Sequence, residues 1–299
     1  MKNATALTAA VLGFCLSACD SSTADAGGVS PSAAAVTPAQ GSASAESVGS
    51  GIDAEAKTQA LEAKLSEGMA YADLRTSVLE AGWLPVQDYS CSEKTGGEAR
   101  ICQELPELEA CSGDGRCVMW FGHDGSGSLL RVDAFGDYTK WQLAGDGALL
   151  NVRAWEFSEA GSARGSAEAA SASPACPAND FQGFLQAFAA DDSVQRAFTR
   201  PLVKVMQYRE LEEASDTYPA LVRAEDYDEF RFEHDQAGFH VVHADGEVDP
   251  TPTPLKVSEA TDGGYSVSYQ YGMSEGNSYV FVKQKGCWYL AADPEAPTP

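Results

Sequence analysis

Six cysteines constrain the fold of this 299-residue chain more than any other feature. Two further cysteines, Cys15 and Cys19, lie near the amino terminus. The six are Cys91, Cys102, Cys111, Cys117, Cys176 and Cys287. Four of them cluster in one half of the chain and two lie at the ends of the other half. Among the possible pairings, this spacing favours the disulfides Cys91–Cys102, Cys111–Cys117 and Cys176–Cys287.

A zinc site is the competing interpretation of the four clustered cysteines. Their spacing, C-x10-C-x8-C-x5-C, lacks the close cysteine pairs that are typical of zinc ribbons and knuckles. We therefore predict disulfides and no metal site. Disulfides require an oxidising compartment, so the chain must be exported.

The amino terminus carries an export signal. Lys2 precedes an apolar run over residues 4–16, which has the length of a signal-peptide core and is too short to span a membrane. The next four positions, Leu16-Ser17-Ala18-Cys19, resemble the lipobox of bacterial lipoproteins. The resemblance implies cleavage after residue 18 and attachment of diacylglycerol, with fatty acids such as palmitate, to Cys19. A secretory signal cleaved after Ala18 is the alternative.

The resemblance also implies a location. Such a chain faces the periplasm from a lipid anchor, and an aspartate directly after the lipidated cysteine, here Asp20, implies retention at the inner membrane. The outer membrane remains the alternative.

The net charge narrows the partners. The chain has 20 Lys and Arg against 44 Asp and Glu, a formal charge of −24. This balance argues against nucleic acid and against a basic membrane-binding patch. It favours solubility or a cationic partner.

Changes in composition divide the chain. Residues 19–52 are rich in Ser, Ala, Gly, Thr and Pro, and we expect a disordered tether of about 30 Å reach. Residues 159–175 have a similar composition and are predicted to be a linker. We therefore expect folded domains at residues 53–158 and 176–292, and a tail at 293–299.

The first domain is predicted to be α+β. Helices are expected over residues 53–67 and 71–81, with Gly82 ending the second. Four antiparallel strands are expected, at residues 117–121, 129–132, 138–143 and 149–157. Residues 68–75, Gly-Met-Ala-Tyr-Ala-Asp-Leu-Arg, resemble the first helix of small helix-plus-sheet modules in bacterial envelope lipoproteins and β-lactamase-inhibitor-like domains. That resemblance implies a sheet that binds proteins.

The second domain is also predicted to be α+β. Asn179 is the expected N-cap of a helix whose core face is formed by Phe181, Phe184, Leu185 and Phe188. A lipid or cofactor site is the alternative for that face. Strands are expected at residues 202–208, 239–243, 255–258, 265–271, 279–282 and 287–290. The helix opening and the closing stretch 285–290, Lys-Gly-Cys-Trp-Tyr-Leu, resemble NTF2-like and cystatin-like domains, which implies a fold but no mechanism.

No catalytic, metal or cofactor residues are predicted. Residues 272–276 match the G-x-S-x-G nucleophile motif around Ser274, but a strand follows and no histidine lies downstream. His240 and His243 would point to opposite faces of a strand, and a site with Glu233, Asp235 and Asp245 stays open. The stretches around His123 and Asp245 lack calcium-loop spacing. The acidic run 225–229 fits a solvated face or a cationic partner.

These features predict a membrane-anchored, non-enzymatic lipoprotein that binds an envelope protein or takes part in envelope assembly. Two alternatives remain. An NTF2-like domain can hold a ligand pocket or an active site, and a buried acid of raised pKa beside an aromatic-lined cavity would favour it. An acidic chain can also inhibit a cationic envelope enzyme.

Overall fold

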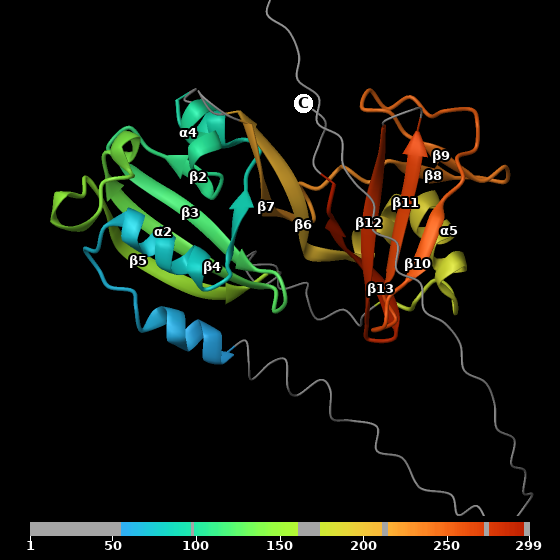
Figure 1. Ribbon diagram of the computed structural model, residues 1–299, viewed down its shortest axis with the longest axis horizontal. Helices are drawn as coiled ribbons and strands as arrows, with labels where there is room; N and C mark the ends of the chain where they lie inside the picture. The colour runs from blue at the N-terminus through green and yellow to red at the C-terminus, as the bar shows by residue number, and fades with distance from the viewer. Residues whose placement is uncertain (1–54, 97–98, 161–173, 211–214, 272–274, 296–299) are drawn as a thin grey trace, which may run out of the picture. The chain divides into compact units, whose positions relative to one another are not determined.

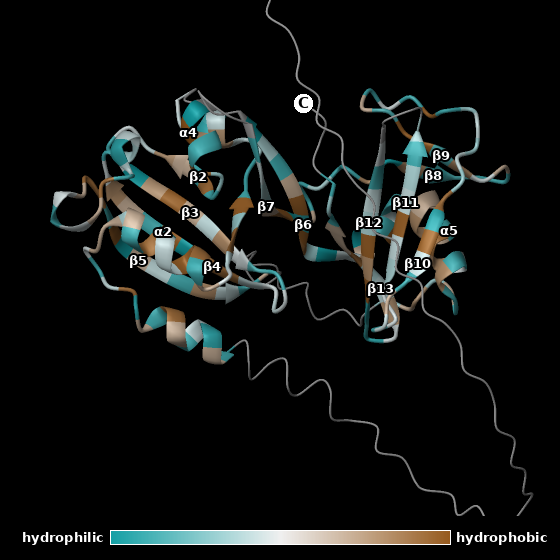
Figure 2. Cartoon of the chain, in the orientation of Figure 1, coloured by the Kyte–Doolittle hydropathy of each residue, from teal (hydrophilic) through white to brown (hydrophobic). Residues whose placement is uncertain are grey.

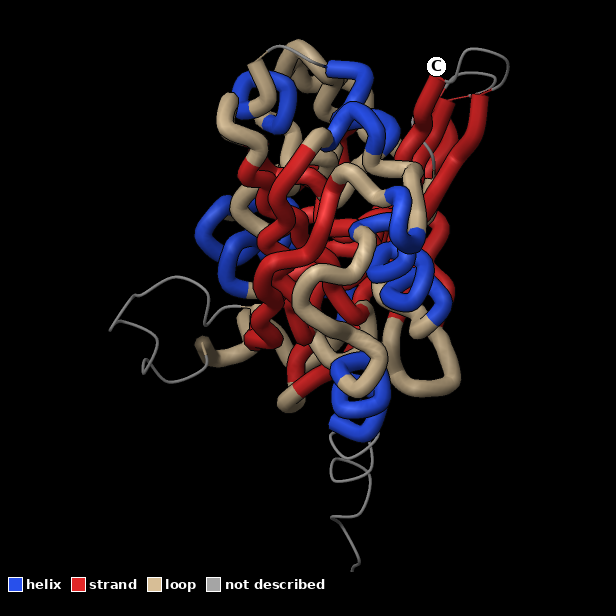
Figure 3. Tube along the Cα trace, turned by 90° about the vertical axis from the view of Figure 1, so that its left-hand side faces the viewer, coloured by secondary structure: helices blue, strands red, loops and turns tan. Residues whose placement is uncertain are grey.

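The computed structural model describes residues 55–96, 99–160, 174–210, 215–271 and 275–295 (Figure 1). The described residues belong to one compact unit. Strands make up most of the regular structure and the helices are short (Figure 3), so the predicted α+β class is confirmed. The predicted signal peptide, Cys19 and the tether lie outside the described residues.

The sheet strands come from both halves of the chain. Those before residue 161 are β1 Leu84–Gln87, β2 Leu108–Cys111, β3 Arg116–His123, β4 Ser128–Gly136 and β5 Leu150–Glu159. Those after residue 173 are β6 Thr199–Glu210, β7 Ser215–Arg223, β10 Lys256–Glu259, β11 Tyr265–Tyr271, β12 Glu275–Gln284 and β13 Cys287–Asp293. A separate hairpin consists of β8 Phe232–His234 and β9 Phe239–Val241.

The helices are a segment at 55–62, α2 Tyr71–Glu80, α3 Cys91–Lys94, α4 Ala99–Glu104, α5 Phe181–Ala190 and α6 Asp192–Ala197. Two 3-10 turns, η1 Tyr138–Lys140 and η2 Gly145–Gly147, lie between β4 and β5. The strand expected at residues 138–143 is therefore wrong. Because β4 and β5 pair directly at Gly136 and Leu150, residues 137–149 are a hairpin loop with no strand beside them.

All eleven sheet strands belong to one mixed sheet, whereas the sequence predicted a separate antiparallel sheet in each domain. The order is β10-β11-β12-β13-β6-β7-β1-β3-β4-β5, with β2 beside β3. Most neighbours are antiparallel, but β1 runs parallel to β7 and β13 runs parallel to β6. The hairpin β6–β7 thus joins the strands of the two predicted domains by backbone pairing.

The core of the first half lies between α2 and the strands β3 to β5. Tyr71, Leu74 and Val78 of α2 are fully buried there. Strand β3 is hydrophobic over much of its length (Figure 2), and buried and half-buried positions alternate from Cys117 to Phe121, as expected for a strand with one buried face. Gly82 adopts φ +84° and Trp83 N–H donates to the carbonyl of Val78, so the predicted glycine stop of this helix is confirmed.

The core of the second half is aromatic. Phe184 and Phe188 of α5 are fully buried against the sheet, where Phe281 lies within 6 Å of both ring centroids. Trp288 of β13 completes this contact with Phe184 at 5.6 Å. Such rings stabilise a core both by burying area and by edge-to-face contacts. The predicted aromatic face of this helix is therefore a packing face.

The six cysteines form three disulfides, with the pairing that the spacing favours. Cys91–Cys102 and Cys111–Cys117 lie in the first half, and Cys176–Cys287 joins the residues before α5 to the first position of β13. Because all four clustered cysteines are bonded in pairs, they are not zinc ligands. The disulfides indicate an extracytoplasmic protein.

Candidate functional site

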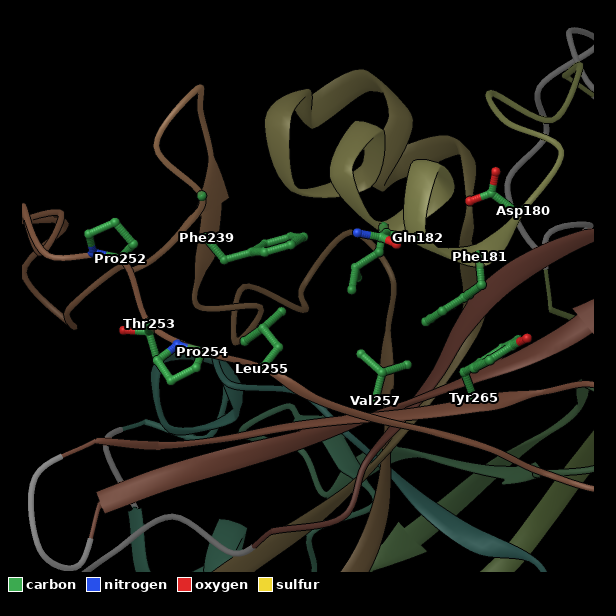
Figure 4. Close-up of a pocket in the computed structure, with 12 residues that line it drawn as sticks. Asp180, Phe181, Gln182, Phe239, Pro252, Thr253, Pro254, Leu255, Val257 and Tyr265 are labelled. Carbon is green, nitrogen blue, oxygen red and sulfur yellow. The ribbon is translucent and has the colours of Figure 1, made fainter.

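The start of α5 forms one wall of an open groove. The N-cap of this helix is Asp180, whose side chain accepts a hydrogen bond from Gly183 N–H at 2.8 Å. The predicted cap, Asn179, is thus one residue too early. In this register Gln182 and Leu185 belong to the lining of the groove. Gln182 is labelled in Figure 4.

The groove has a volume of about 880 Å³. Its lining comes from three segments: the start of α5, residues 238–239 at the start of β9, and residues 252–265. Phe181 and Tyr265 stack face to face at 4.0 Å, and Phe239 extends into the groove toward Gln182 (Figure 4). A groove with aromatic surfaces and a few polar groups suits a ligand that has an apolar part.

The opposite wall is a proline-rich strap, residues 249–255, which bends at residues 250 and 251. Proline occupies positions 250, 252 and 254, which restricts φ along the strap. The strap is held to β9 by two backbone hydrogen bonds, Asp249 N–H to Val241 O at 2.9 Å and Thr253 N–H to Phe239 O at 2.7 Å. This wall is therefore ordered by hydrogen bonding and by proline geometry.

The strap continues into β10, which ends the sheet. All four residues of β10 are exposed, and the side chain of Val257, 46% exposed, lines the groove. Ala260 N–H bonds to Gly264 O in the same register that pairs β10 with β11. Because bonded and non-bonded positions alternate in an antiparallel pair, Val257 and Glu259 direct their backbone N–H and C=O groups to the free edge.

His240 fixes the strap from β9. Its Nδ1 lies 2.8 Å from the carbonyl oxygen of Asp249, and its Nε2 lies 3.0 Å from Asp235 Oδ1. The Asp249 carboxylate in turn accepts a hydrogen bond from Tyr271 OH at 2.7 Å. These contacts raise the pKa of His240, first through the Asp249 carbonyl and then through Asp235.

A buried carboxyl group lies at the end of β13. Asp293 is 5% exposed, and Oδ2 accepts hydrogen bonds from Tyr227 OH at 3.1 Å and Asn277 Nδ2 at 3.2 Å. Burial raises its pKa to about 6 despite these two donors. The lining of the groove does not include Asp293. The buried acid that would favour an enzyme is present, but it is not part of the groove wall.

The four histidines, all of which the structure describes, do not come together in a metal site. No group of three or more His, Cys, Asp or Glu side chains is suited to a metal ion within the described residues. His123 contacts Ser126 in the β3–β4 turn, and His243 lies beyond β9 against the Tyr271 ring at 5.4 Å. His234 packs on Phe239 at 4.6 Å.

Turn chemistry accounts for the remaining motifs. Asp124 pairs with Lys204 at 3.3 Å, and Asp245 accepts from Glu247 N–H at 3.0 Å. Residues 272–274, including Ser274, lie outside the described residues. The strands on either side, β11 and β12, pair as an antiparallel hairpin, so a strand follows this motif where a nucleophile elbow requires a helix.

The acidic run 225–229 is not a uniformly solvated face. Tyr227 within it turns inward and donates to Asp293. The main-chain carbonyl of Glu229 accepts a hydrogen bond from Tyr279 OH at 3.0 Å, and its side chain pairs with Arg231 at 3.1 Å. This segment therefore packs on the second half of the chain while it carries its negative charge.

Sequence reasoning missed the groove. It assigned Phe181 to a core face, with a lipid or cofactor site as the alternative, assigned Tyr265 and Phe239 to strands, and did not predict that the three line one groove. The alternating prolines of residues 250–254 were the available signal, because such a stretch predicts an extended strap and not a turn.

Comparisons with models of known protein families and with curated proteins found no match to this chain. Within the described residues no helix is both long and apolar enough to cross a membrane.

Proposed function

We propose that this protein is a lipid-anchored binding protein of the bacterial envelope, not an enzyme, and that its groove captures an extended segment of a partner protein. The segment would add a strand to β10, using the free backbone groups of Val257 and Glu259, and place an apolar side chain between Phe239 and Tyr265. Strand addition combines main-chain hydrogen bonds with side-chain pockets in this way.

One observation carries the proposal: an apolar groove adjoins a sheet edge that lacks a neighbour among the described strands. The charge of −24 favours a partner segment with basic residues. In this proposal Cys19 carries the lipid, residues 19–52 are the tether, and Asp20 retains the protein at the inner membrane.

The finer description of the fold is part of the same proposal. The chain would consist of two modules, residues 53–158 and 176–292, which share one sheet. The second would be an NTF2-like or cystatin-like module, because α5 packs across the curled strands β11 to β13. Enzyme chemistry is the weaker candidate, since the acid of raised pKa, Asp293, is absent from the groove lining.

Site-specific photo-crosslinking in cells tests the proposal. A photoreactive phenylalanine at Val257, 46% exposed, should give a discrete protein adduct. The matched control is the same residue at Leu143, 43% exposed and outside the groove lining, which should give none. A further Leu255→Arg change, which places bulk and charge in the groove, should abolish the Val257 adduct. Equal adducts from both positions, or from neither, would contradict the proposal.

A Cys19→Ser variant tests the anchor separately. Loss of the thiol that takes the lipid should release the protein from membranes or leave it unprocessed. Retention of this variant in a salt-washed membrane fraction would contradict the lipid anchor.

A further inference from the structure

The His240 side chain ties β9 to both the start of the strap and the β8–β9 turn. Asp235 Oδ1, which contacts His240 Nε2, also accepts from Ala237 N–H at 2.7 Å and Gly238 N–H at 3.2 Å. On the other side of the ring, Nδ1 faces the carbonyl of Asp249. The imidazole therefore bridges two loops that border the groove.

Both groups that face the ring are acceptors. A backbone carbonyl carries no proton, and the Asp235 carboxyl is ionised at neutral pH because its pKa is lowered, mainly by the Ala237 amide. A neutral imidazole has only one N–H, so one of its two contacts would bring a lone pair against an acceptor oxygen. The geometry is satisfied only when both ring nitrogens carry protons.

We propose that protonated His240 is a pH-sensitive fastener that holds the strap against β9, so that the width of the groove depends on pH. When the pH rises above the pKa of His240, the ring loses one proton and one of its two contacts becomes repulsive. The strap can then move away from β9. Its effect on partner binding rests on the proposed function, but the fastener itself does not.

The charges around His240 determine whether its contacts are lost as the pH rises or as it falls. Asp235 and Asp249 approach from the two loops, and both carboxylates favour the imidazolium. Glu233 is the cross-strand partner of His240 on β8. The other groups at the Asp249 end are His243 and Tyr271. Since the folded-state pKa of His240 is raised, its contribution is complete below the ordinary histidine pKa and is lost as pH rises through the raised value.

Deprotonation of His240 should loosen the strap only in part, because other hydrogen bonds also hold it. Tyr271 still binds the Asp249 carboxylate, and Thr253 N–H still bonds to Phe239 O. We therefore expect local opening and not unfolding. Loss of one charged hydrogen bond corresponds to about a tenfold increase in opening.

Nuclear magnetic resonance of the folded chain over about pH 5.5 to 9 tests the fastener without any partner. His240 should titrate above the ordinary imidazole value. Exchange of the Thr253 amide, corrected for base catalysis, should rise about tenfold across the same interval. The amide of Val152, which bonds to Met69 O in the first half, should not respond.

Three variants sharpen the test. His240→Gln should exchange rapidly at Thr253 at every pH, and Asp235→Asn should move the midpoint to lower pH. His123→Gln, in the β3–β4 turn, should leave the wild-type profile unchanged. Constant Thr253 protection through the titration of His240, or a pH dependence that survives in His240→Gln, would overturn the proposal.

The photo-crosslink at Val257, repeated at both ends of the pH range, separates this proposal from the proposed function. A strap that responds to pH with no adduct at either pH would overturn the proposed function alone. An adduct of equal yield at both pH values, with a strap that does not respond, would overturn the fastener alone.

Discussion

Among the described residues, each half of the chain buries one carboxyl group, and the two have opposite surroundings. In the first half the side chain of Glu107 is fully buried, with Arg75 and Tyr71 both donating to Oε1, the latter at 2.7 Å. The Arg75 guanidinium also lies 5.1 Å from the centre of the Trp141 ring. In the second half Asp293 has only neutral donors, and burial raises its pKa to about 6.

This difference in bonding partners predicts that the first half is the more rigid at its buried carboxyl group. A buried carboxylate that is bonded to a guanidinium is held by a charged hydrogen bond, and removal of either partner is costly. A buried carboxyl with neutral donors can change its protonation near neutral pH at little cost. The second half also contains His240 and the groove, so the groups that respond to pH lie on the side of the chain that has the candidate site.

The disulfides also differ between the two halves. Their removal gives the largest predicted effect on the free energy of unfolding. Cys176–Cys287 closes a loop with a sequence separation of 111 residues, whereas Cys111–Cys117 has a separation of 6. Loop-closure entropy predicts a loss of about 5 kcal/mol for replacing the first pair by alanine and about 2 kcal/mol for the second. Urea unfolding of the two double variants measures both. Equal losses would show that loop length does not set the stability of the second half.

Glu107→Gln gives the next effect. It leaves the Arg75 guanidinium beside a neutral amide, and a loss of about 3 kcal/mol in unfolding free energy is expected. Arg75→Met, which removes the cation and keeps its packing on Trp141, is the companion variant. A double-mutant cycle should show a coupling above about 1 kcal/mol. Additive losses would mean that the two groups act independently and that the first half has no special rigidity at this site.

Asp293→Asn should act in the opposite direction. The folded-state pKa, about 6, lies above the ordinary aspartate value, so the cost of ionising Asp293 grows as the pH rises from about 4 to about 6 and is complete above that range. The amide cannot ionise, and we expect a gain of about 1 to 2 kcal/mol near pH 7.5 that disappears near pH 4. Thermal unfolding at the two pH values measures this. A destabilised variant at the higher pH would show that the carboxylate is needed for structure.

The sequence predicted elements whose partners are near in the chain and missed those whose partners are far. The hairpin strands β11 and β12 and the helix α2 follow from local patterns. Strand β7 was missed because Pro219 lies within it, yet this proline lies opposite Met206 of β6, while β1 pairs with β7 only at Leu221 and Val222. Strand β1 does not reach Pro219, so the side of β7 that faces away from β6 has no ladder hydrogen bond to make at this residue, and the missing N–H of proline is tolerated.

Strand β1 shows the same limit. It is four residues long and contains Pro85, so it has no signal of its own. Its place between β3 and β7 depends on a parallel pairing with residues more than 130 positions away. The strand predicted at residues 138–143 was wrong for the opposite reason. Tyr138 and Trp141 have high strand propensity, but β4 and β5 pair with each other and leave them no partner strand. Trp141 instead donates to Glu104 at 3.1 Å.

The smallest predicted effect compares the two core helices. Helix α2 begins at Ala70 without a side-chain cap and ends with a glycine, whereas α5 begins with the Asp180 cap at the groove. Asp180→Ala should lower the unfolding free energy by about 1 kcal/mol, and Asp180→Asn should have almost no effect because the amide oxygen also caps. Urea unfolding distinguishes the variants. If the asparagine variant loses as much as the alanine variant, the charge at the helix start is what stabilises α5, and the start of α5 at the groove would be sensitive to salt where the start of α2, which has no side-chain cap, is not.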